Sequence, residues 1–552
     1  MCNADIFILG AIIEKKQMLR NRKKRTKEKL LSEFGNLKTD SFDFEYIESY
    51  FRKKDHSTVF QTLSDKTCND LDFQELFMFI DRTNSKVGQQ YLYNKLRNIP
   101  ADSSENIENE RLLDEFTNNP DFRASIQSQL SKLNDRDVYY IATLFQDEIL
   151  KPPKWYFIVP LLSFTSVLSF IMAFFDPIFF FVILGVSIIN IVIHFWNKKN
   201  LHNYFSTIPQ LSKLNGVAQE LYKNDILKDI NPNLMKSASV INKVSNRMSF
   251  FNLEVEIQSD QRILFWAMLE LVKIVFLIEP LFLFGTLKRI DTKRTEIEDV
   301  FLFVGEIDAI VSIASLRKGL TNFCTPKIID GQKRLSAQEV YHPLIENCVK
   351  NNLKVNEKSI LLTGSNMSGK TSFIRTIAVN VITGLTINTC FAVHFSMPRV
   401  RVLSAIRISD DLMNDRSYYF EEVMTIKEMI DKSKGGNLNL FLLDEIFKGT
   451  NTVERISAGK AVLSSLNEEN NIVFVSTHDI ELADLLKNEY DLYHFSEIVD
   501  HKTVDFDYKL KEGKLKNRNA IRILQINDYP ESIIKEAIEI SEELDKITAP
   551  NA

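Results

Sequence analysis

The sequence predicts an α/β domain that follows an all-α domain, with a two-helix transmembrane hairpin inserted into the all-α domain. Three observations support this fold class. Two uncharged runs lie next to each other between residues 155 and 196, and the segments around them carry apolar residues at helical spacing. Farther along, a short apolar strand near residue 360 leads into a glycine-framed loop and then into a helix.

The length and composition of the chain exclude some classes of protein. At 552 residues the chain is too long for one core, so several units are expected. Its 26% charged residues and net charge of -5 exclude a polycation that coats nucleic acid, so any nucleic-acid surface has to be local. The five cysteines are scattered without a Cys/His cluster, which indicates a reducing compartment and no zinc site.

The N-terminal segment is expected to be basic and mostly helical. Residues 15–27 carry eight Lys or Arg. One interpretation is a solvated helix face, and the other is an arm that contacts phosphates or an anionic membrane surface. From residue 71 the pattern sharpens into an amphipathic, half-buried helix that includes Tyr91 and Leu96.

The two uncharged runs predict a membrane hairpin. Trp155 to Phe175 and Ile178 to Trp196 are joined by Asp176-Pro177. At 1.5 Å per residue each run spans about 30 Å, the thickness of a bilayer core. Aromatic residues lie at the ends and lysines at the outer flanks, so the positive-inside rule puts both flanks in the cytoplasm. The alternative is a buried hairpin in a soluble core.

Helical segments continue from residue 201 to about 317. Ile263 to Leu287 is apolar but carries Glu270, Lys273 and Glu279, so we expect a buried or interfacial helix rather than a third span. Glu306 and Asp308 are interpreted as a solvated helix face, because nothing local favours a metal site.

A phosphate-binding motif organises the second half of the chain. Gly364 and Gly369 frame a loop of the pattern G-x-x-x-x-G-K-[ST] between a strand and a helix. Such a loop turns its N–H groups toward phosphates, and the helix N-terminus adds partial positive charge. Lys370 is expected to reach the β- and γ-phosphates of ATP, and the Thr371 hydroxyl to bind Mg²⁺. The residues predicted to bind the nucleotide are Gly364, Ser365, Asn366, Met367, Ser368, Gly369, Lys370, Thr371 and Ser372.

Two further strands end in residues suited to hydrolysis. Leu438 to Leu443 leads into Asp444 and Glu445, beside the phosphate loop. Asp444 at a strand end can hold Mg²⁺ through water, and Glu445 can polarise the attacking water. A third strand, Ile472 to Val475, leads to His478, which can sense the γ-phosphate or can be an ordinary surface histidine.

These residues resemble the MutS family of DNA mismatch-repair ATPases. The resemblance covers "TGSNMSGKT" around Lys370, "SDDLMNDRSYYFEE" at 409–422, "LLDEIFKGTNT" at 442–452 and "STHD" at 476–479. It also covers "FIDRTNSKVGQQYLYNKL" at 79–96, "GEIDAIVSIASL" at 305–316 and "YPESIIKEAIEI" at 529–540, which are less specific but follow in the right order.

The resemblance implies roles for single residues. Lys370 and Thr371 would bind phosphates and Mg²⁺, Asp444 would hold Mg²⁺, Glu445 would activate water and His478 would read the γ-phosphate. Ser417 would reach the nucleotide of a partner subunit, and residues 448–452 would lie at the same interface. A homodimer is therefore implied, and DNA is the partner that the family suggests.

The sequence also departs from the family pattern. Ser368 stands where the family usually has glycine, and Tyr418 where it usually has threonine. No aromatic residue is evident near Cys348, where the family tends to stack one on adenine. We expect no mismatch-reading N-terminal domain, because about 70 residues precede the core region, and no C-terminal nuclease-like domain.

The predicted function is an ATP-hydrolysing, dimeric, DNA-binding MutS-like protein at the inner (cytoplasmic) membrane, with its ATPase domain in the cytoplasm. The alternative is a membrane-bound P-loop ATPase or switch of the ABC superclass without a DNA role. A transporter ATPase and a non-catalytic scaffold are less favoured, since two spans are few for a pathway and Glu445 is intact. The expected organisation is a basic segment at 1–70, helical core at 71–152, hairpin at 153–197, helical core and lever at 198–335, ATPase domain at 336–528 and C-terminal helix at 529–552.

Overall fold

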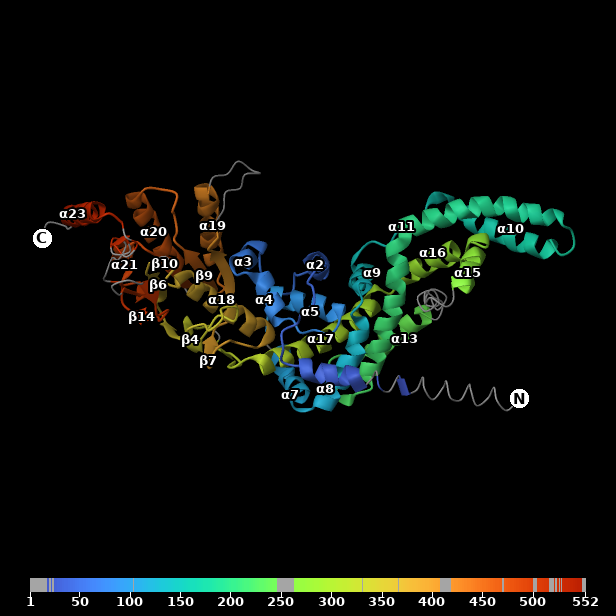
Figure 1. The fold of residues 1–552 in the computed structure, drawn as a ribbon, viewed down its shortest axis with the longest axis horizontal. Coiled ribbons are helices and arrows are strands. Elements are labelled where there is room, and N and C mark those ends of the chain that lie inside the picture. The colour runs from blue at the N-terminus through green and yellow to red at the C-terminus, as the bar shows by residue number, and fades with distance from the viewer. Residues whose placement is uncertain are drawn as a thin grey trace. The chain divides into compact units, whose positions relative to one another are not determined.

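The computed structural model divides the chain into two units that alternate along the sequence (Figure 1). The helical unit comprises residues 1–55, 80–95 and 108–319, and the α/β unit comprises residues 56–79, 96–107 and 320–552. The ranges expected from the sequence, by contrast, are consecutive. The structure describes residues 17–18, 21, 24–102, 104–245, 263–329, 331–365, 367–407, 418–468, 471–499, 504–515, 521, 524–525, 527 and 529–548.

The helical unit is built from α-helices and short 3-10 helices. Most of its core side chains are apolar and lie at helical spacing, as the sequence pattern predicts. Its elements are α2 (Phe44–Lys53), α5 (Lys86–Arg97), α7 (Glu110–Asn118), α8 (Pro120–Leu130), η1 (Ser131–Leu133), η2 (Arg136–Ala142), α9 (Thr143–Gln146), η3 (Lys154–Phe157), α10 (Ile158–Met172), α11 (Ile178–Tyr222), α12 (Asp225–Lys228), α13 (Leu234–Ser245), α15 (Ile263–Val275), α16 (Ile278–Asp291) and α17 (Arg294–Gly319).

Helix α17 is the central helix of this unit, and the position of Asp308 on it differs from the prediction. Asp308 was expected on a solvated face, but its side chain is fully buried. Its carboxylate accepts hydrogen bonds from the backbone N–H groups of Asn84 (2.8 Å) and Ser85 (2.7 Å), at the start of α5. Burial raises the pKa of Asp308. A Cβ on Gly88 would meet the Asp308 side chain at 2.2 Å, so the glycine permits this close approach.

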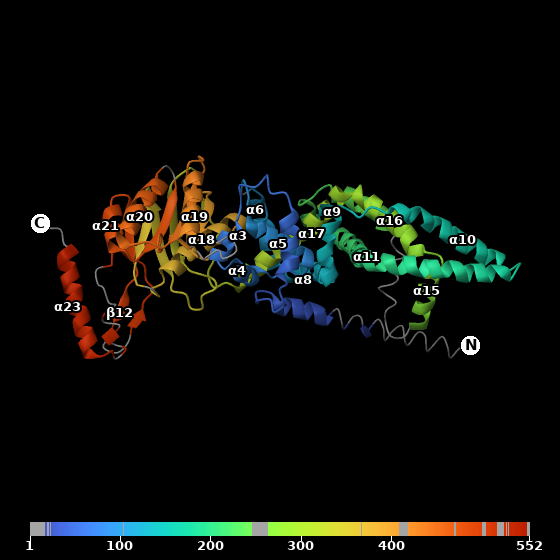
Figure 2. The same cartoon turned by 90° about the horizontal axis from the view of Figure 1, so that it is seen from above.

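The predicted hairpin consists of α10 and α11, which run side by side in both views (Figures 1 and 2). By length and composition Lys154–Met172 and Ile178–Trp196 could span a membrane, with mean hydropathy 1.8 and 2.6. Only 22% and 11% of these windows are buried, unlike the core helices of a soluble protein. Helix α11 does not stop at Trp196 but continues to Tyr222, so one rod joins the apolar hairpin to the rest of the helical unit.

The apolar stretch from Ile263 to Leu287 was expected to form one helix, and it forms two. Helix α15 ends at Val275 and α16 begins at Ile278. Leu277 between them has a φ of 50°, in the left-handed region, which interrupts the helical backbone. The break therefore gives a helix–turn–helix in place of a continuous rod.

The α/β unit combines sheets with flanking helices, as expected for the second half of the chain. Its elements are β1 (Gln61–Thr62), α3 (Asp65–Asp70), α4 (Phe73–Ile80), β2 (Asn98–Ile99), α6 (Ser104–Glu108), β3 (Lys327–Ile328), β4 (Arg334–Val340), β5 (Asn351–Asn356), β6 (Ser359–Thr363), α18 (Lys370–Ile387), β7 (His394–Met397), β8 (Arg401–Ala405), α19 (Tyr418–Ser433), β9 (Asn439–Asp444), α20 (Thr452–Asn467), β10 (Ile472–Thr477), α21 (Ile480–Leu486), β11 (Tyr490–His494), β12 (Glu497–Val499), β13 (Val504–Phe506), β14 (Lys511–Glu512) and α23 (Glu531–Thr548).

The main sheet positions the phosphate loop and Asp444. Its strand order is β14-β11-β6-β10-β9-β8, and all neighbours are parallel except β14 and β11. Strands β6 and β10 are buried along their whole length, as continuous apolar runs predict. Helices α19, α20 and α21 lie beside the sheet (Figure 2), and their apolar side chains form one core with those of the strands. Helix α18 packs against β9 and β10. The smaller sheet has the order β3-β7-β4-β5.

Two early segments of the chain complete the α/β unit. Strands β1 and β2 pair with each other, and the Gln61 side chain bonds both backbone groups of Val402 at 2.7 Å. Asp70 is fully buried, and its carboxylate accepts hydrogen bonds from the Ser404 hydroxyl and the backbone N–H of Arg407. These contacts tie residues 56–79 to the edge strand β8.

Candidate functional site

The phosphate loop follows β6 and ends at the first residue of α18. Gly369 has a φ of 102°, in the left-handed region, so its lack of a Cβ allows the turn into the helix. At Gly364 a Cβ would lie 2.9 Å from the Phe495 carbonyl oxygen. Both glycines are thus required by the local geometry, and the backbone N–H groups at the start of α18 have no intrahelical acceptors.

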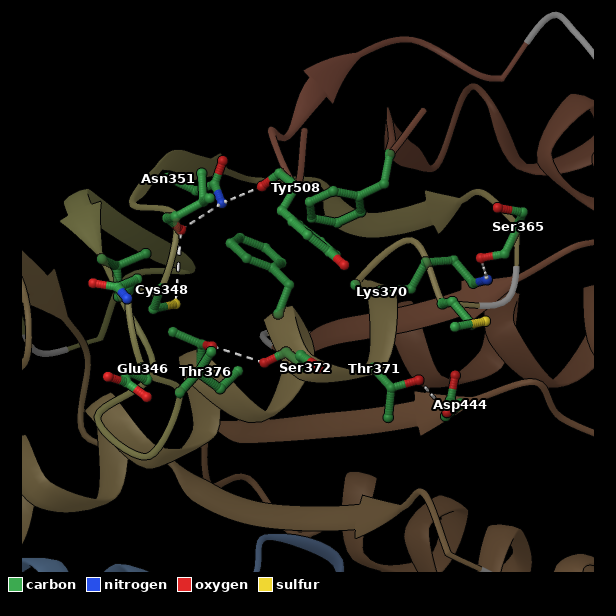
Figure 3. A pocket seen from close by; sticks show the side chains of 18 of the residues that line it. Glu346, Cys348, Asn351, Ser365, Lys370, Thr371, Ser372, Thr376, Asp444 and Tyr508 are labelled. Atoms are coloured by element: carbon green, nitrogen blue, oxygen red, sulfur yellow. Dashed lines mark hydrogen bonds between the residues drawn. The ribbon is translucent and has the colours of Figure 1, made fainter. Parts of the chain in front are cut away.

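Lys370 is folded back over this loop. Its ammonium group donates to the carbonyl oxygens of Gly364 (2.7 Å) and Ser365 (2.8 Å), and burial lowers its pKa. Figure 3 shows the Lys370 and Ser365 side chains around the loop. A buried ammonium with carbonyl partners suits exchange of these partners for the more negative oxygens of a phosphate.

A hydroxyl and a carboxylate meet below the loop. The Thr371 hydroxyl donates to Asp444 at 2.7 Å (Figure 3), and the Ser476 hydroxyl donates to the other oxygen of Asp444. Asp444 does not lie on the strand next to β6, because β10 stands between β6 and β9. The carboxylate reaches Thr371 nonetheless, since parallel strands end at the same edge of the sheet. These oxygen ligands fit Mg²⁺.

Glu445 is held by two cationic partners. One carboxylate oxygen lies 2.7 Å from the Lys448 ammonium, and the other lies 3.2 Å from Nδ1 of His478. The hydrogen bond with His478 has the largest effect on the pKa of Glu445, and Lys448 adds to it. Together they lower this pKa to about 2, although burial alone would raise it. The same hydrogen bond raises the pKa of His478. Glu445 is therefore ionised at neutral pH.

The loop after Glu445 is shaped by a residue that sequence reasoning missed. Glu445 and Phe447 have φ values of 53° and 61°, in the left-handed region. Glu422, on α19 and 1% exposed, accepts a hydrogen bond from the backbone N–H of Phe447. Burial raises the pKa of Glu422. Glu422 thus fixes the backbone that places Glu445 and Lys448.

A cavity of about 790 Å³ extends from these groups toward an apolar end. Figure 3 shows Asn351, Cys348 and Tyr508 on one side and Thr371 and Asp444 on another. Phe373 and Phe495 also line it. The Asn351 amide donates to the Tyr508 carbonyl at 3.0 Å and accepts from the Leu510 N–H at 2.8 Å, which positions Tyr508. A cavity of this size with one polar and one aromatic end fits a nucleotide.

The aromatic residues that the sequence did not reveal near Cys348 come from distant segments. Tyr508 and Phe495 follow the phosphate loop by more than a hundred residues, so the spacing of that loop could not indicate them. Of the other predicted residues, Ser365 donates to Glu497, Met367 is 83% exposed and Ser368 is buried against Gly364. Asn366 and Ser417 lie outside the described residues, as does most of the segment 409–422.

Comparison with known proteins agrees with this geometry. Residues 360–545 match the family model of MutS domain V. This part of the chain is therefore similar to domain V of the MutS family. Similar relatives include the DNA mismatch repair protein MutS of Persephonella marina, with 31% identity over 43% of this chain, and that of Aquifex pyrophilus, with 29% over 44%. The DNA mismatch repair protein MSH3 of Saccharomyces cerevisiae is 28% identical over 47% of the chain.

The match to MutS relatives is partial. It spans 28%, 29% and 27% of the lengths of the Persephonella, Aquifex and yeast proteins, so the chain matches less than a third of each. The part with a family model is the MutS domain V that carries the phosphate loop, Asp444, Glu445 and His478. The MutS resemblance seen in the sequence is thereby confirmed for this domain.

Proposed function

We propose that this protein binds ATP with Mg²⁺ and hydrolyses it. The observation that carries the proposal is the direct contact between Thr371 and Asp444, with Glu445 as the next residue and the phosphate loop immediately before Thr371. The similarity of residues 360–545 to MutS domain V, and of the chain to a DNA mismatch repair protein MutS, supports the same conclusion.

The side chains have separate tasks in this reaction. Lys370 exchanges its two carbonyl partners for phosphate oxygens, and Thr371 and Asp444 hold the metal ion. Bound Mg²⁺ neutralises charge on the phosphates. Glu445 orients a water molecule for attack, and His478, which contacts Glu445, senses the γ-phosphate. Each oxygen of Glu445 has one partner in the structure, Lys448 or His478, and keeps a further lone pair that can accept a hydrogen bond from water.

A second part of the proposal is a homodimer that acts on DNA from the membrane. Ser417 of each chain would contact the nucleotide of the other, and the segment 448–452 would lie at the interface. Val453, directly after this segment, is 76% exposed, which leaves an apolar side chain for a partner to cover. The exposed apolar surfaces of α10 and α11 support attachment to a membrane. The lysines at the outer flanks of the hairpin favour the inner membrane with the ATPase domain in the cytoplasm.

The hydrolytic role of Glu445 is tested with the purified full chain. Glu445→Gln should bind ATP but release phosphate about 10²- to 10⁴-fold more slowly, because the amide cannot act as a base. The matched control is Glu428→Gln, an exposed position on α19 whose partner is Lys432, and it should hydrolyse ATP like the wild type. Equal phosphate release by Glu445→Gln and wild type would refute the assignment.

The DNA part is tested with detergent-solubilised protein and matched, mismatched and branched duplexes, with and without ATP, at two salt concentrations. Binding that ATP changes and salt weakens would support DNA handling. The alternative is a membrane-bound switch of the ABC superclass without a DNA role. Absence of binding at low salt, beside intact ATP hydrolysis, would establish that alternative.

A further inference from the structure

A cluster of ionisable side chains is buried between the hairpin and the helix pair α15–α16. His194 of α11 is 1% exposed, and its Nε2 and Nδ1 lie 3.2 Å from Glu270 and 3.6 Å from Glu279. Lys273 lies 3.0 Å from Glu279, which is fully buried. The two carboxylates of the apolar stretch therefore point toward the hairpin, and Lys273 pairs with them.

The opposite face of the helix pair is apolar and uncovered. Met268 and Leu271 of α15 are 65% and 64% exposed, and Phe282 of α16 is 54% exposed. A helix pair on the surface of a water-soluble protein has the reverse distribution, with apolar side chains inward and charges outward. Charges inward and apolar side chains outward are the distribution expected in lipid.

Hydrogen bonds fix the depth of the turn between α15 and α16. The Asn190 amide donates to the carbonyl of Val275 at 2.7 Å, and the Ser163 hydroxyl donates to the carbonyl of Phe276 at 2.8 Å. The rings of Trp155 and Trp196 are 4.8 Å apart and mark one end of the hairpin. At 1.5 Å per residue, Ser163 lies about 12 Å and Asn190 about 9 Å beyond that end.

The turn therefore lies within the apolar span and its carbonyl groups are bonded by hairpin side chains. Non-helical backbone is tolerated at membrane depth only when the protein satisfies it in this way. From the turn, α16 returns toward the same end of the hairpin, since the Tyr156 hydroxyl donates to the Pro280 carbonyl at 2.8 Å and the Tyr156 ring packs on Phe284. The last turn of α16 carries Lys288 and Arg289.

We propose that α15 and α16 enter the bilayer beside the hairpin as a re-entrant pair that does not cross it, with Met268, Leu271 and Phe282 against the acyl chains. This inference rests on the proposed membrane attachment and enlarges it from two helices to four. The ion cluster of His194, Glu270, Lys273 and Glu279 then joins the pair to the hairpin away from lipid.

The test uses inverted membrane vesicles that contain the full chain and a membrane-impermeant maleimide, with labelling at each introduced position read by mass spectrometry. Leu271→Cys and Phe282→Cys probe the helix pair. Leu184→Cys, 57% exposed on the hairpin, is the membrane reference, and Met235→Cys, 44% exposed on α13, is the aqueous reference. ATP hydrolysis by each variant shows that it is folded.

Leu271→Cys and Phe282→Cys should resist labelling as Leu184→Cys does, and their labelling should rise severalfold after detergent is added. Labelling of both at the rate of Met235→Cys, while Leu184→Cys stays protected, would overturn the re-entrant pair and leave the hairpin in the membrane. Free labelling of Leu184→Cys would overturn the membrane attachment itself, and the re-entrant pair with it.

Discussion

One carboxylate oxygen of Glu445 pairs with His478 and the other with Lys448, and these two contacts determine the protonation state of Glu445. Glu445 has its pKa lowered to about 2, so its ion pairs stabilise the fold above the unfolded pKa of about 4.3 and this contribution is lost as the pH falls toward 2. His478 has a raised pKa, so its contribution is present below about 6.5 and is lost as the pH rises through the raised value.

The pairing with Glu445 predicts the titration of His478. In the wild type its midpoint should lie above the ordinary value near 6.5, and in Glu445→Gln it should fall toward that value because the anionic partner is gone. NMR of the protein labelled on histidine Cε1 measures both midpoints, with His478→Gln to assign the signal. An unchanged midpoint in Glu445→Gln would mean that the resting ion pair does not form in solution.

The position of Tyr508 in the cavity predicts that its ring stacks on the base of a bound nucleotide. Loss of one stacked aromatic side chain costs about 1–3 kcal/mol, so Tyr508→Ala should raise the Kd for ATP roughly 5- to 150-fold. Tyr508→Phe keeps the ring and should bind ATP like the wild type. Calorimetry with ATP and with inorganic triphosphate separates the two ends of the cavity, since triphosphate binding should not change in Tyr508→Ala. Equal weakening for both ligands would place Tyr508 at the phosphates instead.

At the residue scale the sequence predicts the phosphate end of the site and not the base end. Lys370 and Thr371 lie in one contiguous motif, whose spacing encodes its geometry. Tyr508 comes from another element and carries no local pattern, and Glu422 closes the quoted segment 409–422 without being singled out by it. Asp308 was misjudged because helical spacing does not distinguish a solvated carboxylate from one buried on the backbone N–H groups of another helix.

Among the elements, the sequence predicts the existence of the hairpin, the strands and the P-loop helix, since each has a long apolar run or a motif. It does not predict the length of α11, because the polar residues after Trp196 look like a helix end but continue the same helix to Tyr222. The break at Leu277 does have a signal in the sequence, because Pro280 falls in the first turn of α16, where proline is tolerated, but the long apolar run obscures it.

The hairpin gives a prediction at this scale. Because most side chains of its two apolar windows are exposed, the full chain should stay in the pellet when membranes are washed with alkaline carbonate. A variant with Asp at Leu184 and Val192, two exposed positions of the hairpin, should shift toward the soluble fraction, since charges inside a bilayer are costly. Recovery of the wild type in the soluble fraction would make the hairpin a protein-covered element.

For the whole molecule, the proposed sharing of sites between subunits predicts complementation. Lys370→Ala and Ser417→Ala chains should each be inactive, and an equal mixture should regain about a quarter of the wild-type activity, because half of the dimers are mixed and each has one intact site. Steady-state phosphate release measures this. The control mixture combines the Lys370→Ala chain with a chain that carries both Lys370→Ala and Ser417→Ala. No intact site can form in this mixture, because neither chain has Lys370. If the first mixture stays as inactive as this control, Ser417 does not act across a dimer.

The interleaving of the two units along the chain has a consequence for biosynthesis. Gln61 and Val402 bond each other across 341 residues. At a synthesis rate of about 5–20 residues per second, Val402 is synthesised roughly 20 to 70 s after Gln61. The apolar hairpin leaves the ribosome during that interval. The α/β unit therefore cannot fold as an early, independent domain, and a gene fragment that begins at residue 320 would lack the β1–β2 pair and Asp70, leaving the edge of β8 uncovered.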